Sequence, residues 1–196
     1  MKAVALLSSG IDSPVAIYLM LRKGFEVTPV HFRQSPKKES KVLELCEVLG
    51  RYGRLNEPVI VDAYEEQAPV FSKLAGIGKA KWTCLFCKWT MVRKACRIGH
   101  RTSARAIITG DSLGQVASQT LDNLLIISTA SDLPILRPLI GLDKEEIVGI
   151  AKNIGTFGMS IEPEEQCPFV PRHPVVRGSP EEFRKIKRQL MNWGVL

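Results

Sequence analysis

Apolar segments typical of β-strands alternate with helical patterns along almost the whole chain. The strand candidates are residues 3–7, 26–32, 59–62 and 106–109, with a weaker one at 133–136. Helices are expected between them, the first from about Ser13 to Lys23, because Gly24 is the kind of residue that ends a helix. Strands that alternate with helices form a parallel sheet. The sequence therefore predicts an α/β fold with a parallel sheet of about five strands and helices on both faces.

Local signals mark the ends of the later helices. Ser35-Pro36 predicts a helix that ends by Gly53, and the capping-box patterns at 143–146 and 179–182 predict two more helices, the first of them ending at Gly155. Two stretches read as irregular, 65–81 and the proline-rich 162–178. No linker or repeat divides the chain, so we expect one domain over 1–178 and, in 179–196, an amphipathic helix packed on it.

Composition narrows the class of protein. The formal charge of +7 suits a polyanionic partner. Five cysteines are an odd number, which favours metal or catalytic roles over a disulfide framework. The longest apolar runs are far shorter than a membrane span, and Met1 leads into a strand candidate without a signal peptide. We therefore expect a cytoplasmic protein without membrane association.

The first strand candidate runs directly into a small polar turn, Ser8-Ser9-Gly10-Ile11-Asp12-Ser13. Small residues let backbone N–H groups curl around an anion, Ser8 and Ser13 add hydroxyls, and Pro14 directs the positive end of the next helix to the same place. No P-loop lysine follows, which excludes a Walker loop. The turn predicts a phosphate site, with an ordinary strand–turn–helix junction as the alternative.

Other polar segments follow strands in the same way. His31-Phe32 and Thr109-Gly110 end two strand candidates, and the small and amide side chains of 109–124 suit a nucleotide pocket better than a packed core. In an open parallel sheet, ligands bind beyond the carboxyl ends of the strands. We expect these segments and the phosphate turn to line one crevice.

Cysteines supply a second candidate chemistry. Cys84 and Cys87 stand at the head of a predicted helix with Thr83 as its N-cap, and we expect helix N–H groups and nearby cations to lower the pKa of both thiols. Zinc needs further ligands, for which Cys167 and three scattered histidines remain. Cys46 and Cys96 are interpreted as small buried apolar residues. His100 and His173 are interpreted as loop residues in solvent.

Together these motifs resemble the pyrophosphate-loop (PP-loop) ATPases, and in particular the PP-loop domain of the ThiI family of tRNA 4-thiouridine synthetases. The resemblance runs in order from Leu6 to about Pro174 and includes Cys84–Lys88, the block 109–124, and the motifs at 134–140, 143–147 and 154–156. It implies a Rossmann-like domain that splits ATP between its α and β phosphates. Ser9 replaces the first glycine of the family's SGGxDS loop. We expect a stand-alone form, since the family's tRNA-gripping THUMP region and the rhodanese domain of some members have no counterpart in this sequence.

The resemblance also implies site residues. It assigns adenylation to Asp12 and Lys144: Asp12 can hold Mg²⁺ against the pyrophosphate, and Lys144 can neutralise charge on the transferred phosphoryl group. The alternatives are an Asp12 that only shapes the turn and a Lys144 that is a surface residue of a capping box. The ATP contacts that it implies are Leu6, Leu7, Ser8, Ser9, Gly10, Ser13, His31, Phe32, Lys88, Gly110 and Gln119.

For sulfur, the resemblance places Cys167 at the position of the family's sulfur-handling cysteine. A CxxC pair with this cysteine is associated with an iron–sulfur cluster in shorter members, so Cys84, Cys87 and Cys167 are candidate cluster ligands. A persulfide on Cys167 alone and a zinc site are the other readings.

The function implied is that of an ATP-dependent tRNA sulfurtransferase. It adenylates a tRNA uridine, at position 8 by the resemblance, and replaces its oxygen with sulfur to give 4-thiouridine. One alternative is an enzyme of the same fold that acts on another tRNA base or on a thiamine thiazole precursor. Another is a catalytic subunit that needs a separate THUMP-bearing RNA-binding partner. The sulfur donor, a cysteine desulfurase or sulfide, and the oligomeric state, a homodimer among others, stay open.

Overall fold

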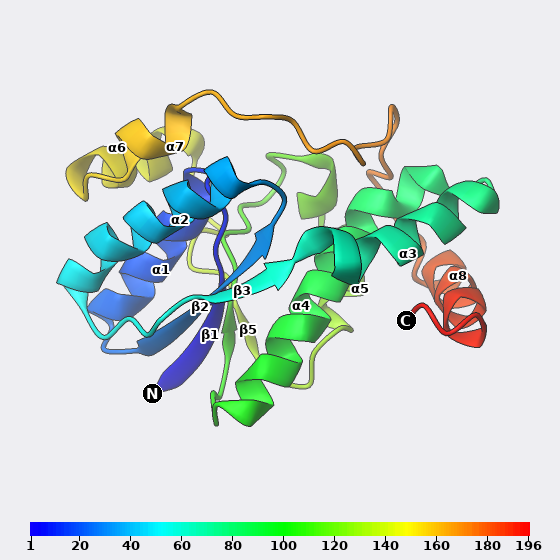
Figure 1. Cartoon of the computed structure of the whole chain (residues 1–196), viewed down its shortest axis with the longest axis horizontal. Coiled ribbons are helices and arrows are strands. Elements are labelled where there is room, and N and C mark those ends of the chain that lie inside the picture. The colour runs from blue at the N-terminus through cyan, green and yellow to red at the C-terminus, as the bar shows by residue number, and fades with distance from the viewer.

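A parallel sheet forms the centre of the molecule (Figure 1). The computed structural model describes residues 1–196, the side chain of Ala117 excepted. Over these residues the sheet has five strands in the order β3-β2-β1-β4-β5, and every neighbouring pair is parallel. This confirms the predicted fold class. The strands are β1 (Lys2–Leu6), β2 (Glu26–Arg33), β3 (Val59–Asp62), β4 (Ile107–Ile108) and β5 (Ile135–Leu136).

Helices cover both faces of the sheet (Figure 1). One face carries α1 (Asp12–Arg22), α2 (Pro36–Leu49), α6 (Lys144–Asn153) and α7 (Phe157–Ile161). The other carries α3 (Ala63–Gly76), α4 (Thr83–Arg101), α5 (Leu121–Ser128) and α8 (Pro180–Asn192). Three short 3-10 turns, Gly50–Tyr52, Ala80–Trp82 and Ala117–Gln119, join these elements in the described chain.

Alternate residues of the central strand enter two separate cores. Val4 and Leu6 of β1 pack toward α3, α4, α5 and α8, whereas Ala3 and Ala5 pack toward α1, α2 and α6. Side chains of a strand point alternately to opposite faces, so a strand buried on both sides is apolar throughout. This burial explains the uninterrupted apolar run at the start of the sequence.

The predicted helix ends are largely confirmed. Gly24 and Gly155 adopt positive φ values of 80° and 79° just after α1 and α6. Asp143 and Glu146 form the expected reciprocal capping box, and the Ser35 side chain accepts a hydrogen bond from a backbone N–H in the first turn of α2. The structure thus follows the local chemistry of the sequence at these positions.

One prediction about the helices was wrong. Much of the stretch 65–81 belongs to α3, because the Asp62 carboxylate caps the helix and Val70, Phe71 and Leu74 are buried against the core. Burial therefore outweighs the presence of Pro69 inside the helix. The helix that begins at Pro36 ends at Leu49, before Gly53 as predicted, and a 3-10 turn follows it.

The segment 162–178 contains neither helix nor strand in the described structure, as predicted. It crosses from α7 on one side of the sheet to α8 on the other (Figure 1). In α8, Phe183, Ile186 and Leu190 are buried, while Trp193 just beyond the helix is 45% exposed. The division of the chain at residue 178 stays a prediction.

No helix within the described residues has the length and apolar character needed to span a membrane.

Candidate functional site

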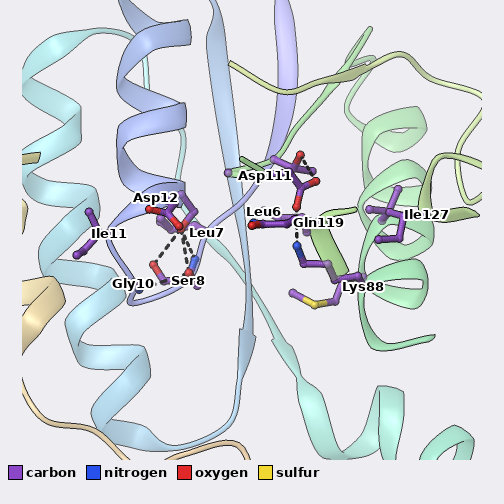
Figure 2. A pocket seen from close by; sticks show the side chains of 15 residues that line it. Leu6, Leu7, Ser8, Gly10, Ile11, Asp12, Lys88, Asp111, Gln119 and Ile127 are labelled. Carbon is purple, nitrogen blue, oxygen red and sulfur yellow. Dashed lines mark hydrogen bonds and ion pairs between the residues drawn. The ribbon is translucent and has the colours of Figure 1, made fainter. Parts of the chain in front are cut away.

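A cavity lies where the carboxyl ends of β1 and β4 meet (Figure 2). Its volume is about 230 Å³. These two strands connect to helices on opposite faces of the sheet, and such a switch point is where open α/β sheets bind ligands. The expected crevice is therefore present between the phosphate turn and Thr109-Gly110, although His31 and Phe32 do not line it. The predicted ATP contacts that line it are Leu6, Leu7, Ser8, Gly10, Ser13, Lys88, Gly110 and Gln119, together with Asp12.

The turn after β1 forms one wall of this cavity. Its backbone is held by Ser13, whose Oγ accepts a hydrogen bond from the Ser8 N–H at 2.9 Å. The N-cap of α1 is Ile11, and no side chain among the described residues caps this helix end. The first N–H groups of α1 thus have no side-chain cap in the described structure, and a helix N-terminus of this kind binds phosphate.

Gly110 brings the second wall close to the first. A Cβ at this position would lie 2.8 Å from both the Cα and the N of Ser13. Only a residue without a side chain lets the loop after β4 approach the first turn of α1 so closely. Gly110 therefore sets the width of the cavity.

Asp111 is a site residue that the sequence did not single out. It is 3% exposed, and its carboxylate accepts hydrogen bonds from Lys88 at 2.5 Å, Thr109 at 2.8 Å and Arg137 at 3.3 Å. Burial alone would raise the pKa of Asp111, but these partners outweigh it and hold the pKa below its usual value. Asp111 thus fixes Lys88 at the wall of the cavity (Figure 2). A carboxylate directly after a strand, followed by small residues, was the available signal.

Asp12 and Lys144 meet although 132 positions separate them. Lys144 Nζ lies 2.6 Å from Asp12 Oδ1, with half of the lysine side chain exposed. The N-terminus of α6 therefore lies beside that of α1. The two residues predicted to serve adenylation share one place at the cavity mouth, and their opposite charges pair there.

Three predicted ATP contacts lie outside the cavity lining. Phe32 packs in the core that faces α4. Ser9 turns away and donates a hydrogen bond to Glu164 at 2.9 Å. His31 is buried behind Leu7, with its Nδ1 3.0 Å from the Leu7 carbonyl, and burial lowers the pKa of His31. The position of each follows from burial in the sheet or from a competing polar partner, which a motif does not show.

Four buried polar side-chain atoms have no hydrogen-bond partner in the described structure, and two of them, Oε1 of Gln119 and Nε2 of His31, belong to predicted ATP contacts. Such atoms are costly to bury unless something else satisfies them. Gln119 Oε1 belongs to a cavity-lining residue, so a polar ligand bound in the cavity can supply the missing donor.

A second cavity, of about 260 Å³, contains the three predicted sulfur residues. Cys84 and Cys87 come from the first turns of α4, and Cys167 comes from the segment 162–178. Aromatic and aliphatic side chains make up much of the remaining wall. Lys88 and Met91 line this cavity and the first one alike. The expected convergence of the three cysteines on one place is therefore observed, directly beside the first cavity.

The prediction of low thiol pKa values was wrong. Burial raises the pKa of Cys87 to about 12, and burial, with Cys167 adding to it, also raises the pKa of Cys84. Lys88 does little to offset this, since its ammonium group is paired with Asp111. The helix begins one residue earlier than expected, with Trp82 rather than Thr83 as its N-cap. Desolvation of a thiolate thus dominates over the helix end and the cation.

Polar contacts hold the Cys167 segment against the phosphate turn and α2. Glu164 accepts hydrogen bonds from Ser9 and from Lys41, whose side chain is only 3% exposed. Lys41 also donates to the Glu162 carbonyl at 3.0 Å, and Lys37 donates to the Pro163 carbonyl at 2.8 Å. Ser9, the departure from the SGGxDS pattern, therefore joins the phosphate turn to the segment that carries Cys167.

The remaining cysteines and histidines lie elsewhere. Cys46 is half-buried in α2, and burial raises its pKa to about 11. Cys96 is buried as predicted, but its Sγ donates to Asp132. His100 belongs to the last turn of α4, not to a loop, because that helix continues to Arg101. His173 is exposed.

Comparison with known proteins finds relatives that match this chain over most of its length. The family model described as "Thiamine biosynthesis protein (ThiI)" matches residues 1–192. A "Probable tRNA sulfurtransferase" of Thermococcus kodakarensis is 54% identical over 187 residues, which cover 94% of this chain and 49% of that protein. One from Methanocaldococcus jannaschii is 46% identical, covering 96% of this chain and 50% of that protein. The chain thus spans about half the length of these curated relatives.

Among solved structures, the chain matches the "Crystal structure of a 4-thiouridine synthetase - RNA complex with bound ATP" with a TM-score of 0.88 at 37% identity. That match covers 99% of this chain and 51% of the other. A U34-tRNA thiolase from Methanococcus maripaludis shares the fold, with a TM-score of 0.55 at 15% identity and coverage of 98% of this chain and 67% of that one.

Proposed function

Because the chain belongs to the ThiI family, as the match over residues 1–192 shows, we propose that it is the ATP-dependent catalytic part of a tRNA sulfurtransferase. One observation carries this proposal: the phosphate-binding cavity and the three-cysteine cavity share the side chains of Lys88 and Met91. Thiolation of a carbonyl needs both chemistries within one substrate's reach, since the oxygen leaves only after activation. Two adjoining cavities meet that requirement.

Adenylation takes place in the first cavity. ATP binds with its phosphates against the turn 8–13 and the N-terminus of α1, and with polar base or ribose atoms toward Gln119. The uridine oxygen attacks the α-phosphorus, and pyrophosphate leaves. When ATP is bound, Lys144 leaves its ion pair with Asp12 and pairs with the phosphate instead. There it neutralises the charge that develops on the transferred phosphoryl group. The present ion pair keeps both side chains at the cavity mouth before ATP binds.

Asp12 fits a magnesium ligand. It is a partly exposed carboxylate in the first turn of α1, beside the proposed phosphate position. Mg²⁺ favours one or two carboxylates together with substrate phosphates. When bound, Mg²⁺ supplies positive charge to the departing pyrophosphate, while Asp12 and the turn keep the phosphates in place.

Sulfur is supplied from the second cavity. The three cysteines provide the soft donors that an iron–sulfur cluster needs, and Gln67 Nε2 lies 3.3 Å from Cys87 Sγ as a donor to that sulfur. A cluster on three cysteines would supply one iron with an open position for sulfide. The raised thiol pKa values describe the metal-free protein, since a coordinated thiol loses its proton. Cys84, Cys87 and Cys167 would hold such a cluster, which would supply sulfide to displace AMP from the adenylated carbon.

The RNA substrate and the partners complete the proposal. We take the substrate to be a tRNA uridine at position 8 in the cytoplasm, with sulfide or a cysteine desulfurase as the sulfur source. The positive charge of the chain supports only weak binding to RNA on its own, so a THUMP-type RNA-binding region or partner delivers the tRNA. Binding of tRNA to this chain alone should fall steeply as salt rises. Tight binding that survives high salt would contradict this division of labour.

Adenylation is tested by following AMP formation from ATP with unmodified tRNA. Asp12→Asn and Lys144→Ala are expected to abolish AMP formation while the far-UV circular dichroism stays unchanged, because both side chains are partly exposed. Asp122→Asn and Lys23→Ala are the matched controls, since both residues are exposed and lie outside the cavity lining. Wild-type AMP formation by either test variant would refute its proposed role.

Sulfur transfer is tested with protein purified without oxygen. We expect iron and acid-labile sulfide, both lost in Cys84→Ala, Cys87→Ala and Cys167→Ala but retained in Cys46→Ala. Activity that needs Cys167 alone, in a colourless protein, would instead establish a persulfide. Analysis of tRNA nucleosides from a strain that lacks the gene then distinguishes a missing 4-thiouridine from a thiazole defect, which shows as a thiamine requirement with normal tRNA.

A further inference from the structure

The C-terminal end of α4 carries a cluster of metal-ligating side chains that the proposed reaction does not use. Cys96 and His100 lie one helical turn apart, and Asp132 lies in the turn between α5 and β5. Cys96 Sγ lies 3.0 Å and His100 Nε2 lies 2.9 Å from the same carboxylate oxygen, Asp132 Oδ1. The three ligand atoms all lie within 4.8 Å of one another.

The backbone around this cluster is shaped to bring Asp132 onto the helix. A Cβ on Gly99 would lie 2.8 Å from Leu133 Cδ1, so the side chain that follows Asp132 packs directly on α4 at this position. Ser131 Oγ accepts a hydrogen bond from the Leu133 N–H and donates one to the Leu133 carbonyl, both at 2.9 Å. These contacts hold the turn on either side of Asp132.

We propose that Cys96, His100 and Asp132 bind a divalent cation of the zinc class, with water at the fourth position. A thiolate, an imidazole and a carboxylate are the ligands that zinc takes in proteins, and three protein ligands with an open position are common for this ion. Magnesium and calcium prefer sites made of oxygen alone, so the sulfur and nitrogen donors select against them.

The present geometry needs only a small change to accept the ion. Tetrahedral bonds of about 2.0–2.3 Å place neighbouring ligand atoms about 3.4–3.6 Å apart. The two contacts with Asp132 Oδ1, at 3.0 and 2.9 Å, must therefore each open by about 0.5 Å. Asp132 and His100 have side chains that are 73% and 54% exposed and can move, whereas Cys96 is buried and fixes the depth of the ion. The thiol proton passes to solvent as the Sγ–metal bond forms.

Binding ties the end of α4 to the turn that leads into β5. An ion that binds the folded chain and not the unfolded chain raises the melting temperature. The site is thus expected to stabilise the junction of helix and sheet at the end of α4 opposite to Cys84 and Cys87.

The test uses imidazole resonances, because the chain has three histidines and His100 alone belongs to this cluster. Adding one equivalent of Zn²⁺ to the metal-free full chain is expected to shift the ring signals of His100, leave those of His31 unchanged and raise the melting temperature. Both effects should disappear in Cys96→Ala and in Asp132→Asn, and both should persist in Cys46→Ala.

The surface variant Asp132→Asn keeps the test informative if the buried variant Cys96→Ala fails to fold. Unchanged His100 signals at one hundred micromolar Zn²⁺, or equal shifts in wild type and Asp132→Asn, would overturn the proposal. A loss of bound zinc that follows only Cys84 or Cys167 would do the same, because it would assign the ion to the other cysteines.

Discussion

Replacing Gly110 with alanine is expected to damage both stability and ATP binding. The added Cβ would lie 2.8 Å from the Ser13 Cα, about 0.7 Å inside the shortest favourable carbon–carbon separation. The nearest atoms on the other side are backbone atoms of Ser13 and Asp12, which cannot rotate away. Overpacking costs about 1–3 kcal/mol, and this rigid contact belongs at the upper end, about 2–3 kcal/mol. For a chain of this size the melting temperature should fall by about 4–12 °C.

The same displacement moves the turn that faces the phosphates. Loss of two backbone hydrogen bonds to a charged phosphate, at about 1.5 kcal/mol each, weakens ATP binding by about 3 kcal/mol, or roughly a hundredfold. Urea unfolding and ATP titration calorimetry measure the two effects. Gly141→Ala is the control, because a Cβ there meets nothing within 4 Å. The reasoning would be refuted if Gly110→Ala had a free energy of unfolding within about 0.5 kcal/mol of the wild type and an unchanged affinity for ATP.

Further predictions concern charge, pH and the Ser9 contact. Asp111→Asn leaves Lys88 and Arg137 without their carboxylate and should lower the free energy of unfolding in urea by about 2–3 kcal/mol. The loss is smaller than for a fully buried pair because Lys88 is partly exposed. A near-neutral result, like the one expected for the control Asp122→Asn, would contradict this. Since burial raises the pKa of Cys87 to about 12, its contribution to stability is complete below about pH 9 and declines as the pH rises toward 12, by up to about 1.4 kcal/mol per unit. Between pH 9 and pH 12, the free energy of unfolding should therefore fall less steeply with pH in Cys87→Ala than in the wild type. Identical slopes in the two proteins would contradict the raised pKa of Cys87. Ser9→Gly should leave ATP affinity unchanged but speed hydrogen exchange around Glu164, and slow exchange there would show that other contacts hold the segment.

Local chemistry in the sequence was sufficient for the fold class and for most element boundaries. The run Ala3–Leu7 is apolar because both faces of its strand are covered, and the caps at Ser35 and Asp143 act on backbone groups within a few residues. Because both partners of such a short-range interaction lie within a few residues of each other, a local stretch of sequence is enough to predict it. The stretch 65–81 was predicted to be irregular, yet much of it is helical, because burial of Val70, Phe71 and Leu74 supports a helix that contains Pro69.

The sequence also determined which chemistries are present, through the phosphate turn and the three cysteines. Only the tertiary structure decided how they meet. It paired Asp12 with Lys144, buried Asp111 under Lys88, and removed Ser9 and His31 from the cavity lining. It also reversed the expected thiol pKa shifts, because desolvation depends on everything packed around Cys87. Distances and burial arise from segments far apart in the chain, and for that reason no single motif contains them.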